Sequence, residues 1–259
     1  MKRFVAGAFL LAAGAAFTEA RASEGHFDVF VGAAGSQTAY GGIDVDDGDV
    51  TLNERVFESE MGDIGTVFIS DEPGFNHPES DAVLPPGVTS LADGDEIFVR
   101  KLTSTFDGAT SDLFFWDGTG APAFAPAVDA TFDIVTDPGD SIGTAGAGGG
   151  FDDHPLYELG NGGSLPAPGI YLGAFEVQVG VLDPSDLLYL VMGTEGLITA
   201  DFLGITQGEF DMLTDEDLDE ELEEVIEAAV GVVELSLIPE PGTLALVSFA
   251  GLALAARRR

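Results

Sequence analysis

The chain contains three histidines, and their imidazoles are its best candidate ligands for a transition-metal ion. His26 precedes a short apolar run, whereas His77 and His154 each stand directly before a proline and shortly after a phenylalanine. Proline restricts the residue before it to extended backbone, so these two imidazoles would project in a defined direction. One hypothesis is therefore that the three imidazoles, or two of them with Asp28 or Asp153, bind zinc or copper. The alternative is that the histidines are unrelated loop residues.

A second candidate site is an acid-rich stretch in which Asp44, Asp46 and Asp49 offer carboxylates to calcium. An EF-hand loop that starts at Asp44 needs an acidic or amide side chain at its fifth position and glutamate at its twelfth. Those positions hold Gly48 and Arg55, so the EF-hand register fails. A hairpin turn between two strands explains the stretch better. An irregular calcium site on the same carboxylates stays open, because calcium accepts variable oxygen geometry.

No short catalytic motif stands in the sequence context that would point to an enzyme class. The Gly-x-Ser-x-Gly spacing occurs at residues 139–143, but no helix is predicted after it, as a nucleophile elbow requires. The sequence has no His-Glu-x-x-His helix, and its glycine-rich stretches complete neither a phosphate loop nor a dinucleotide fingerprint. The absence of cysteine excludes a thiol nucleophile, thiolate metal ligands and disulfides. Carboxylates are too abundant for two of them to be singled out as a glycosidase pair. We predict a non-catalytic protein. The alternative is a periplasmic or surface metal-binding protein or hydrolase that uses the histidines or clustered carboxylates. A Ser-His-Asp triad without a recognisable sequence motif would also serve a hydrolase.

The elements that would position these side chains are predicted to be mainly β-strands. Apolar or alternating runs recur between glycine, proline and aspartate, as where Phe175, Val177 and Val179 alternate with polar residues. Many short strands without a βαβ rhythm favour an antiparallel β-sandwich, jelly-roll-like in form. The expected strands are 27–31, 42–45, 50–58, 66–70, 96–102, 112–116, 131–135, 170–179, 187–192 and 232–237.

One acidic amphipathic helix is predicted near the C-terminus. Thr214 can cap its first turn, and acidic residues follow where the helix dipole favours negative charge. The apolar stripe consists of Leu218, Leu222, Val225, Ile226 and Ala229. This stripe predicts packing against the core. The alternative is that the helix acts through its opposite, acidic face, which would bind calcium from the solvent.

The N-terminal residues 1–22 have the layout of a secretory signal helix. Two basic residues precede a short apolar run, and the small residues Ala20 and Ala22 follow it. Signal peptidase is expected to cut between Ala22 and Ser23. A retained anchor helix is the alternative, and it is disfavoured because a short apolar run followed by small residues suits removal.

The 14 uncharged residues 243–256 are predicted to form a short transmembrane helix. Such a helix rises about 21 Å, and snorkelling arginines can make up part of the difference from the membrane thickness. Arg257, Arg258 and Arg259 would form a membrane stop on the cytoplasmic side, leaving the rest of the protein outside. An amphipathic core helix is the alternative, but the segment is apolar all round.

Pro239, Glu240 and Pro241 form a rigid polar step immediately before this apolar segment. Each proline disfavours helix at the preceding residue, so the helix is expected to start after the step. A Pro-Glu-Pro step, a short apolar helix and a basic end together resemble the PEP-CTERM sorting signal of Gram-negative bacteria. The resemblance is confined to residues 238–259.

The resemblance implies a route for the protein. In that family the tail holds an exported protein in the inner membrane until an exosortase-type transpeptidase processes it at or near the motif. The protein then goes to the cell surface or the extracellular matrix, where polysaccharide is an expected partner. The resemblance implies no function for the single exported β-rich domain, residues 23–237.

Charge limits the partners of this domain. The whole chain has 46 acidic residues against nine lysines and arginines. Six of the nine lie in the two terminal segments, so the domain keeps only Arg55, Arg100 and Lys101 against 44 carboxylates. So acidic a surface repels nucleic acid and anionic membranes, which excludes both as direct partners of the domain. It is typical of a protein that stays soluble in a saline environment, and the alternative is specific cation binding.

Overall fold

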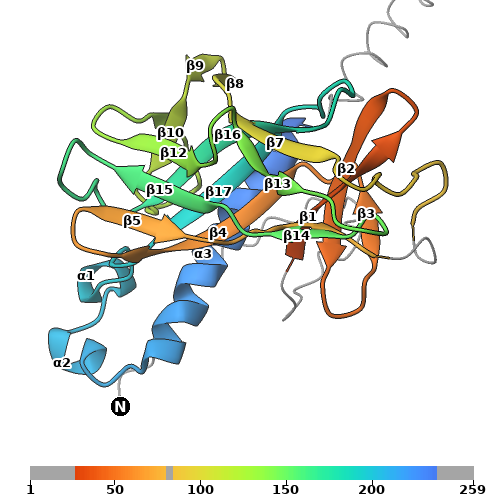
Figure 1. The fold of residues 1–259 in the computed structure, drawn as a ribbon. Coiled ribbons are helices and arrows are strands. Elements are labelled where there is room, and N and C mark those ends of the chain that lie inside the picture. Colours follow the sequence, from red (N-terminus) through yellow and green to blue (C-terminus); the bar gives the residue numbers. More distant parts are fainter. Residues whose placement is uncertain (1–26, 80–83, 238–259) are drawn as a thin grey trace, which may run out of the picture.

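The computed structural model describes residues 27–79 and 84–237, and this part of the chain is mainly β-structure (Figure 1). Several predicted residues lie outside the described ranges: Ala20, Ala22, Ser23, His26, Pro239, Glu240, Pro241, the apolar segment 243–256 and Arg257, Arg258 and Arg259. Within the described ranges, no helix combines the length and the apolarity needed to cross a membrane.

The smaller of the two main sheets carries the cluster of side chains described in the next subsection. It consists of β1 (Phe27–Ala34), β2 (Gln37–Asp44), β3 (Val50–Leu52), β6 (Phe75–His77) and β14 (Phe151–Asp153). The spatial order is β14-β6-β1-β2-β3. β1 and β2 form a long antiparallel hairpin, whereas β6 runs parallel to β1 and antiparallel to β14.

The larger sheet gathers strands from most of the remaining chain. It consists of β4 (Val56–Asp63), β5 (Val67–Ser70), β7 (Glu96–Lys101), β10 (Leu113–Trp116), β11 (Ala125–Pro126), β12 (Thr131–Val135), β13 (Ser141–Thr144), β15 (Leu156–Gly160), β16 (Ile170–Val179) and β17 (Leu188–Thr194). The order is β11-β10-β16-β17-β4-β5-β15-β12, with β7 also paired to β16 and β13 to β7. A separate hairpin is formed by β8 (Ser104–Phe106) and β9 (Ala109–Ser111).

Two strand pairs depart from the predicted antiparallel arrangement. β1 pairs with β6 and β4 pairs with β17 in parallel, so both main sheets are mixed. Neither pair is joined by a direct hairpin, and parallel neighbours need a longer crossover. The direction of such distant pairs is set by core packing, which a strand-by-strand pattern does not contain.

The central strands β16 and β17 are buried on both faces. Successive residues enter two different core clusters: Leu190 joins one and Val191 joins the other. The first cluster also takes in Val29 and Phe75 from the smaller sheet. Near-continuous apolar sequence in these two strands follows from this two-sided burial.

The predicted amphipathic helix is confirmed as α3 (Asp215–Leu237), which packs against β17 and β4 (Figure 1). Its buried side chains are Leu222, Ile226, Ala229 and Val233. The predicted cap is also present, because the backbone N–H of Asp217 donates to Thr214 Oγ1 at 3.2 Å. In return, the backbone N–H of Thr214 donates to the Asp217 carboxylate at 2.7 Å, which satisfies a second group at this helix end.

The structure shifts the limits of several predicted strands, corrects two of the strands more substantially and adds two short helices. The predicted strand 232–237 is wrong, because these residues continue α3 to its end. Val233 lies one helical turn after Ala229 and is buried with it, so packing outweighs the β-propensity of valine. The predicted strand 50–58 is divided in two by a turn at Asn53, whose φ is 64°. The added helices are α1 (Ala200–Leu203) and α2 (Gln207–Phe210).

Candidate functional site

The pairing of β1, β6 and β14 brings side chains from distant parts of the chain together. Phe75 of β6 pairs with Val29 of β1 on one side and with β14 on the other. Extending this register by one residue places Asp28, Gly74 and His154 in one row across the three strands. Paired residues on neighbouring strands point to the same face, and Gly74 has no side chain. Asp28 and His154 therefore approach each other over the glycine.

Asp28, Asp152 and His154, called the Asp28 cluster below, each offer one ligand atom, and these atoms lie within 4.8 Å of one another. Nε2 of His154 lies 3.5 Å from Oδ1 of Asp152. The backbone N–H of Gly74 donates to Oδ1 of Asp28 at 2.8 Å. Glu72, in the loop between β5 and β6, places its Oε1 at 3.5 Å from Nδ1 of His154. Three segments of the chain, around Asp28, Gly74 and His154, thus meet on the smaller sheet.

The backbone determines which nitrogen of His154 carries a proton. Nδ1 lies 3.1 Å from the carbonyl oxygen of Asp71. A carbonyl oxygen only accepts hydrogen bonds, so Nδ1 is protonated and donates to it. In the neutral ring the lone pair is then on Nε2, the nitrogen that faces Asp152.

The Asp28 cluster has one buried member and two accessible ones. Asp28 is 1% exposed, whereas the side chains of His154 and Asp152 are 39% and 68% exposed. Burial raises the pKa of Asp28, and the nearby imidazole partly opposes that rise. Burial alone would lower the pKa of His154, but Asp28, the Asp71 carbonyl, and the neighbouring carboxylates raise it, and the net direction is upward. The cluster therefore favours a positive charge among its carboxylates.

His77 lies outside the Asp28 cluster, and its contacts are those of a residue packed in the protein interior. Its side chain is buried, and Nδ1 donates to the carbonyl oxygen of Val31 at 2.7 Å. The ring also stacks on Phe30, with ring centroids 5.7 Å apart. Of the predicted histidine ligands inside the described ranges, the cluster therefore contains His154 and omits His77. The hypothesis of a site that these two share is corrected accordingly.

The carboxylates around His154 agree only partly with the sequence prediction. Asp28 lies beside one imidazole, whereas the hypothesis paired it with two, and Asp153 is not part of the cluster. Asp152 and Glu72 are missed by the sequence reasoning. A signal for Asp152 exists, since residues two apart on a strand share a face and Asp152 precedes His154 by two positions. Glu72 lies in a loop, and the sequence carries no comparable signal for it.

The acid-rich stretch at Asp44 forms the predicted turn. Oδ1 of Asp44 accepts hydrogen bonds from the backbone N–H groups of Asp46 at 3.0 Å and Asp47 at 3.2 Å. The backbone of Asp44 also pairs with that of Asp49 across the turn. The carboxylates of Asp44, Asp46 and Asp49, all within the described chain, do not form a group with ligand atoms within 4.8 Å. The hairpin explanation is thus confirmed, and Asp44 acts as its internal hydrogen-bond acceptor.

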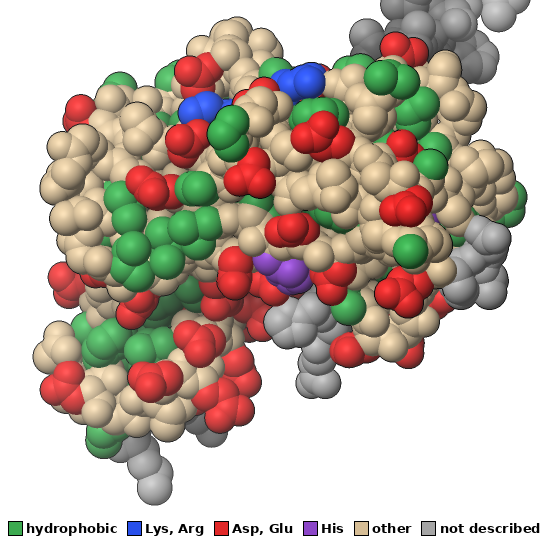
Figure 2. All heavy atoms as spheres, in the orientation of Figure 1, with side chains coloured by type: hydrophobic (Ala, Val, Ile, Leu, Met, Phe, Trp, Pro, Cys, Tyr) green, Lys and Arg blue, Asp and Glu red, His purple; other side chains and the backbone are tan. Residues whose placement is uncertain are grey.

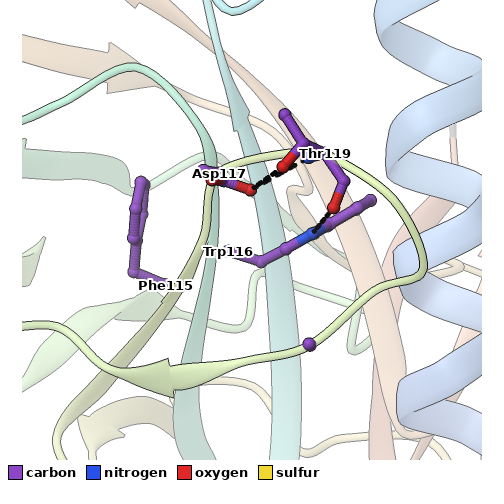
Figure 3. A pocket seen from close by; sticks show the side chains of 5 residues that line it. Phe115, Trp116, Asp117 and Thr119 are labelled. Carbon is purple, nitrogen blue, oxygen red and sulfur yellow. Dashed lines mark hydrogen bonds between the residues drawn. The ribbon is translucent and has the colours of Figure 1, made fainter.

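A shallow pocket lies at the end of β10, where it is lined by Phe115, Trp116, Asp117, Thr119 and Ala123 (Figure 3). Nε1 of Trp116 donates to the carbonyl oxygen of Thr119 at 3.1 Å. Asp117 accepts from the backbone N–H of Thr119 at 3.0 Å and from its hydroxyl at 2.7 Å. These hydrogen bonds lower the pKa of Asp117. The polar groups here hold the loop together, and Trp116 is itself buried.

A second concentration of carboxylates, called the β4–α3 seam below, lies where α3 packs on β4. Its members are Glu54, Glu58, Glu60, Asp219, Glu223, Glu227 and Glu234. Burial first, and then the charges of Glu234 and Glu58, raise the pKa of Glu54 to about 7. Burial and repulsion from carboxylates of α3 also raise the pKa values of Glu58 and Glu60. The seam is thus a place where like charges face one another between two packed elements.

Acidic side chains are spread over the visible surface as well. Figure 2 shows many red carboxylates on this face and few blue basic groups. Within the described residues, Arg100 makes ion pairs with Glu176 at 3.1 Å and Asp140 at 3.4 Å. Nζ of Lys101 lies 3.9 Å from Oδ1 of Asp133. Most carboxylates must therefore be balanced by ions from the solvent.

Comparison with known proteins gives this chain no family. No protein-family model, no curated protein and no solved structure matches it.

Proposed function

We propose that this is an exported, non-catalytic protein of the cell surface or extracellular matrix, sorted through a PEP-CTERM-type tail. The observation that carries the proposal is the order of features at residues 238–259: the Pro239-Glu240-Pro241 step, an uncharged segment and three terminal arginines. The secretory layout of residues 1–22 agrees with it, because a tail of this kind acts on exported proteins. Signal peptidase and an exosortase-type transpeptidase are the processing partners. Extracellular polysaccharide is the expected partner after sorting.

The position of α3 supports access to the tail. The described residues of this helix extend to Leu237, two residues before Pro239. Its last turn is partly exposed, with Leu235 59% exposed. An exposed stretch of α3 this close in sequence to the motif leaves room for a membrane-bound enzyme to approach.

A β-sandwich is the architecture we propose for the exported domain. Side chains from both main sheets enter one core cluster, as Val29 of the smaller sheet and Leu190 of the larger one do. Two sheets that share a core in this way are the basic arrangement of a sandwich. A jelly-roll-like order would have to accommodate the two parallel strand pairs described above.

The sorting part of the proposal is tested by replacing Pro239-Glu240-Pro241 with three alanines in the producing organism. The apolar segment would persist while the recognition step is lost, so the variant should stay in the membrane fraction. Pro86→Ala, an exposed proline replacement in the domain, is the matched control and should be released normally. Normal release of the triple-alanine variant would contradict the proposal.

The export part is tested separately by N-terminal sequencing of the released protein. Cleavage after Ala22 should give a chain that begins at Ser23. Released material that still begins at Met1 would contradict cleavage by signal peptidase, whatever the fate of the tail.

A further inference from the structure

Three properties distinguish the Asp28 cluster from an ordinary group of surface acids. It combines carboxylates with an imidazole, its ligand atoms lie within 4.8 Å of one another, and one of its carboxylates is buried. Asp28 comes from β1, Asp152 from β14 and His154 from the position directly after β14, so Asp28 is far in sequence from the other two. The sheet register described above assembles them, so their proximity is a property of the fold.

The imidazole of His154 is oriented as a metal ligand would be. Nδ1 donates to the Asp71 carbonyl, which leaves Nε2 with the lone pair toward Asp152. Metal-binding histidines commonly donate their second ring N–H to a carbonyl or carboxylate, which fixes both the tautomer and the ring orientation.

The buried carboxylate of Asp28 supplies the second requirement. One of its oxygens accepts a hydrogen bond from Gly74, and its burial is nearly complete. A buried carboxylate is stable only when it is paired, hydrogen-bonded or bound to a cation. Asp28 thus provides an anchor inside the sheet, while the accessible side of the cluster lets an ion enter from solvent.

We propose that Asp28, Asp152 and His154 together bind one divalent first-row transition-metal ion, through two carboxylate oxygens and Nε2 of the imidazole. Glu72 lies close enough to join them or to hold a metal-bound water, and water would complete the coordination. Zinc binds histidine nitrogen at about 2.0–2.1 Å and carboxylate oxygen at about 2.0–2.2 Å, so two ligand atoms on one ion are at most about 4.4 Å apart. Small side-chain movements close the cluster to this size.

The nitrogen ligand decides the class of ion. Calcium and magnesium take oxygen ligands, and calcium needs six to eight of them. Imidazole suits zinc, copper, iron and nickel, and a mixed nitrogen and oxygen set is common among transition-metal sites. A transition-metal ion here would tie β1 to β14 across β6. It would also give the exported domain a metal site that needs no cysteine.

The test uses the full chain, purified in detergent to accommodate its apolar C-terminal segment and stripped of metal with a chelator. Zinc is then titrated in competition with a chromophoric chelator, in an excess of calcium that occupies the many non-specific carboxylates. We expect one zinc equivalent to bind tightly. His154→Gln and Asp152→Asn should each weaken this equivalent at least tenfold, whereas Asp153→Asn, a neighbouring carboxylate outside the cluster, should leave it unchanged. This result does not depend on whether the tail is processed.

Cobalt(II) in place of zinc supplies a second measurement, since its visible absorption reports the ligands directly. The wild-type chain and Asp153→Asn should show the same ligand-field bands, and His154→Gln should lose them while keeping its circular dichroism spectrum. The proposal is overturned if no zinc binds in excess calcium, if calcium displaces it on equal terms, or if His154→Gln binds zinc and cobalt as the wild type does.

Discussion

Gly74 lies directly against the imidazole of His154: a β-carbon at position 74 would be 2.6 Å from Cε1 and 2.7 Å from Nε2 of that ring. The same β-carbon would be 2.8 Å from Oδ1 of Asp28. Real β-carbons essentially never come within 3.0 Å of such atoms. The absence of a side chain at residue 74 is therefore what lets the carboxylate and the imidazole meet.

Gly74→Ala is the first variant that this geometry singles out. The methyl group must displace His154, Asp28 or the backbone that donates to Asp28. We expect the free energy of unfolding to fall by about 1–3 kcal/mol, as for other overpacked sites. We also expect zinc affinity to fall at least tenfold. Chemical denaturation and the competition titration measure the two effects.

Gly62→Ala on β4 is the matched control for Gly74→Ala. A β-carbon at position 62 would meet only the carbonyl oxygen of Ile69, at 3.9 Å, which is ordinary contact. Its unfolding free energy should change by less than that of Gly74→Ala, and its zinc affinity should not change. If the two variants behaved alike, the contact between residue 74 and the imidazole would have no energetic importance.

The Asp28 cluster shows why the sequence identified part of the site and missed the rest. His154 and Asp28 stand out because imidazoles are rare in this chain and Asp28 lies in an apolar run. Their meeting depends on the parallel pairing of β1 with β6, which no local pattern encodes. His77 has a sequence context like that of His154, yet its ring is buried on Phe30. Similar local sequence thus gave two different environments.

Glu54 carries the prediction on pH. Its pKa is raised from 4.5 to about 7 in the folded protein, so the folded state holds this proton more tightly than the unfolded chain does. The contribution of the protonated Glu54 carboxyl to the free energy of unfolding is fully present below about pH 4.5, and it is lost as the pH rises through about 7. Glu54→Gln should therefore be more stable than the wild type at pH 8, by about 2 kcal/mol after allowance for partial solvent screening. The gain should vanish near pH 4.

Urea denaturation at a series of pH values measures this effect, and Glu220→Gln is its control. Glu220 is exposed on α3, outside the seam. Replacing an exposed side chain of this kind should shift stability only slightly. A parallel pH profile for wild type and Glu54→Gln would show that the carboxyl of Glu54 ionises freely in the folded protein.

The helix α3 shows a similar limit in the prediction of the fold. Its apolar stripe and its cap at Thr214 are local features, and both were predictable. Its last six residues read as a strand because they contain two adjacent valines. Their helical state depends on contact with the second core cluster, to which Val233 belongs. The mixed direction of the sheets has the same origin, since it is decided by packing between distant segments.

Gly193 on β17 tests how closely α3 is docked. A β-carbon there would lie 2.5 Å from Cδ1 and 2.6 Å from Cγ1 of Ile226. Ile226 belongs to α3, and its side chain is buried. Gly193→Ala should lower the free energy of unfolding by about 1–3 kcal/mol. A second change, Ile226→Val, removes the Cδ1 atom and should recover part of the loss in the double variant. Thermal melts of the two single variants and the double variant measure this coupling. Additive losses would contradict the contact.

Salt should stabilise the protein, because its carboxylates far outnumber its cationic groups. Repulsion between exposed charges is screened over about 10 Å at 0.1 M salt and about 3 Å at 1 M. The same screening weakens the pairs of Arg100 with Glu176 and Asp140, but these are few and partly exposed. The melting temperature should therefore rise with sodium chloride, by roughly 2–4 °C for each kcal/mol of repulsion relieved.

Calcium separates general screening from local binding in the same measurement. At matched ionic strength, an equal rise with calcium and sodium means that screening accounts for the whole effect. A larger rise with calcium means that neighbouring carboxylates bind it, and the β4–α3 seam is the place to look, since three of its members have raised pKa values from burial and mutual repulsion. Glu58→Gln should then reduce the calcium increment while Glu220→Gln leaves it unchanged. A melting temperature that responds to neither ion would show that the acidic surface has no net cost to the fold.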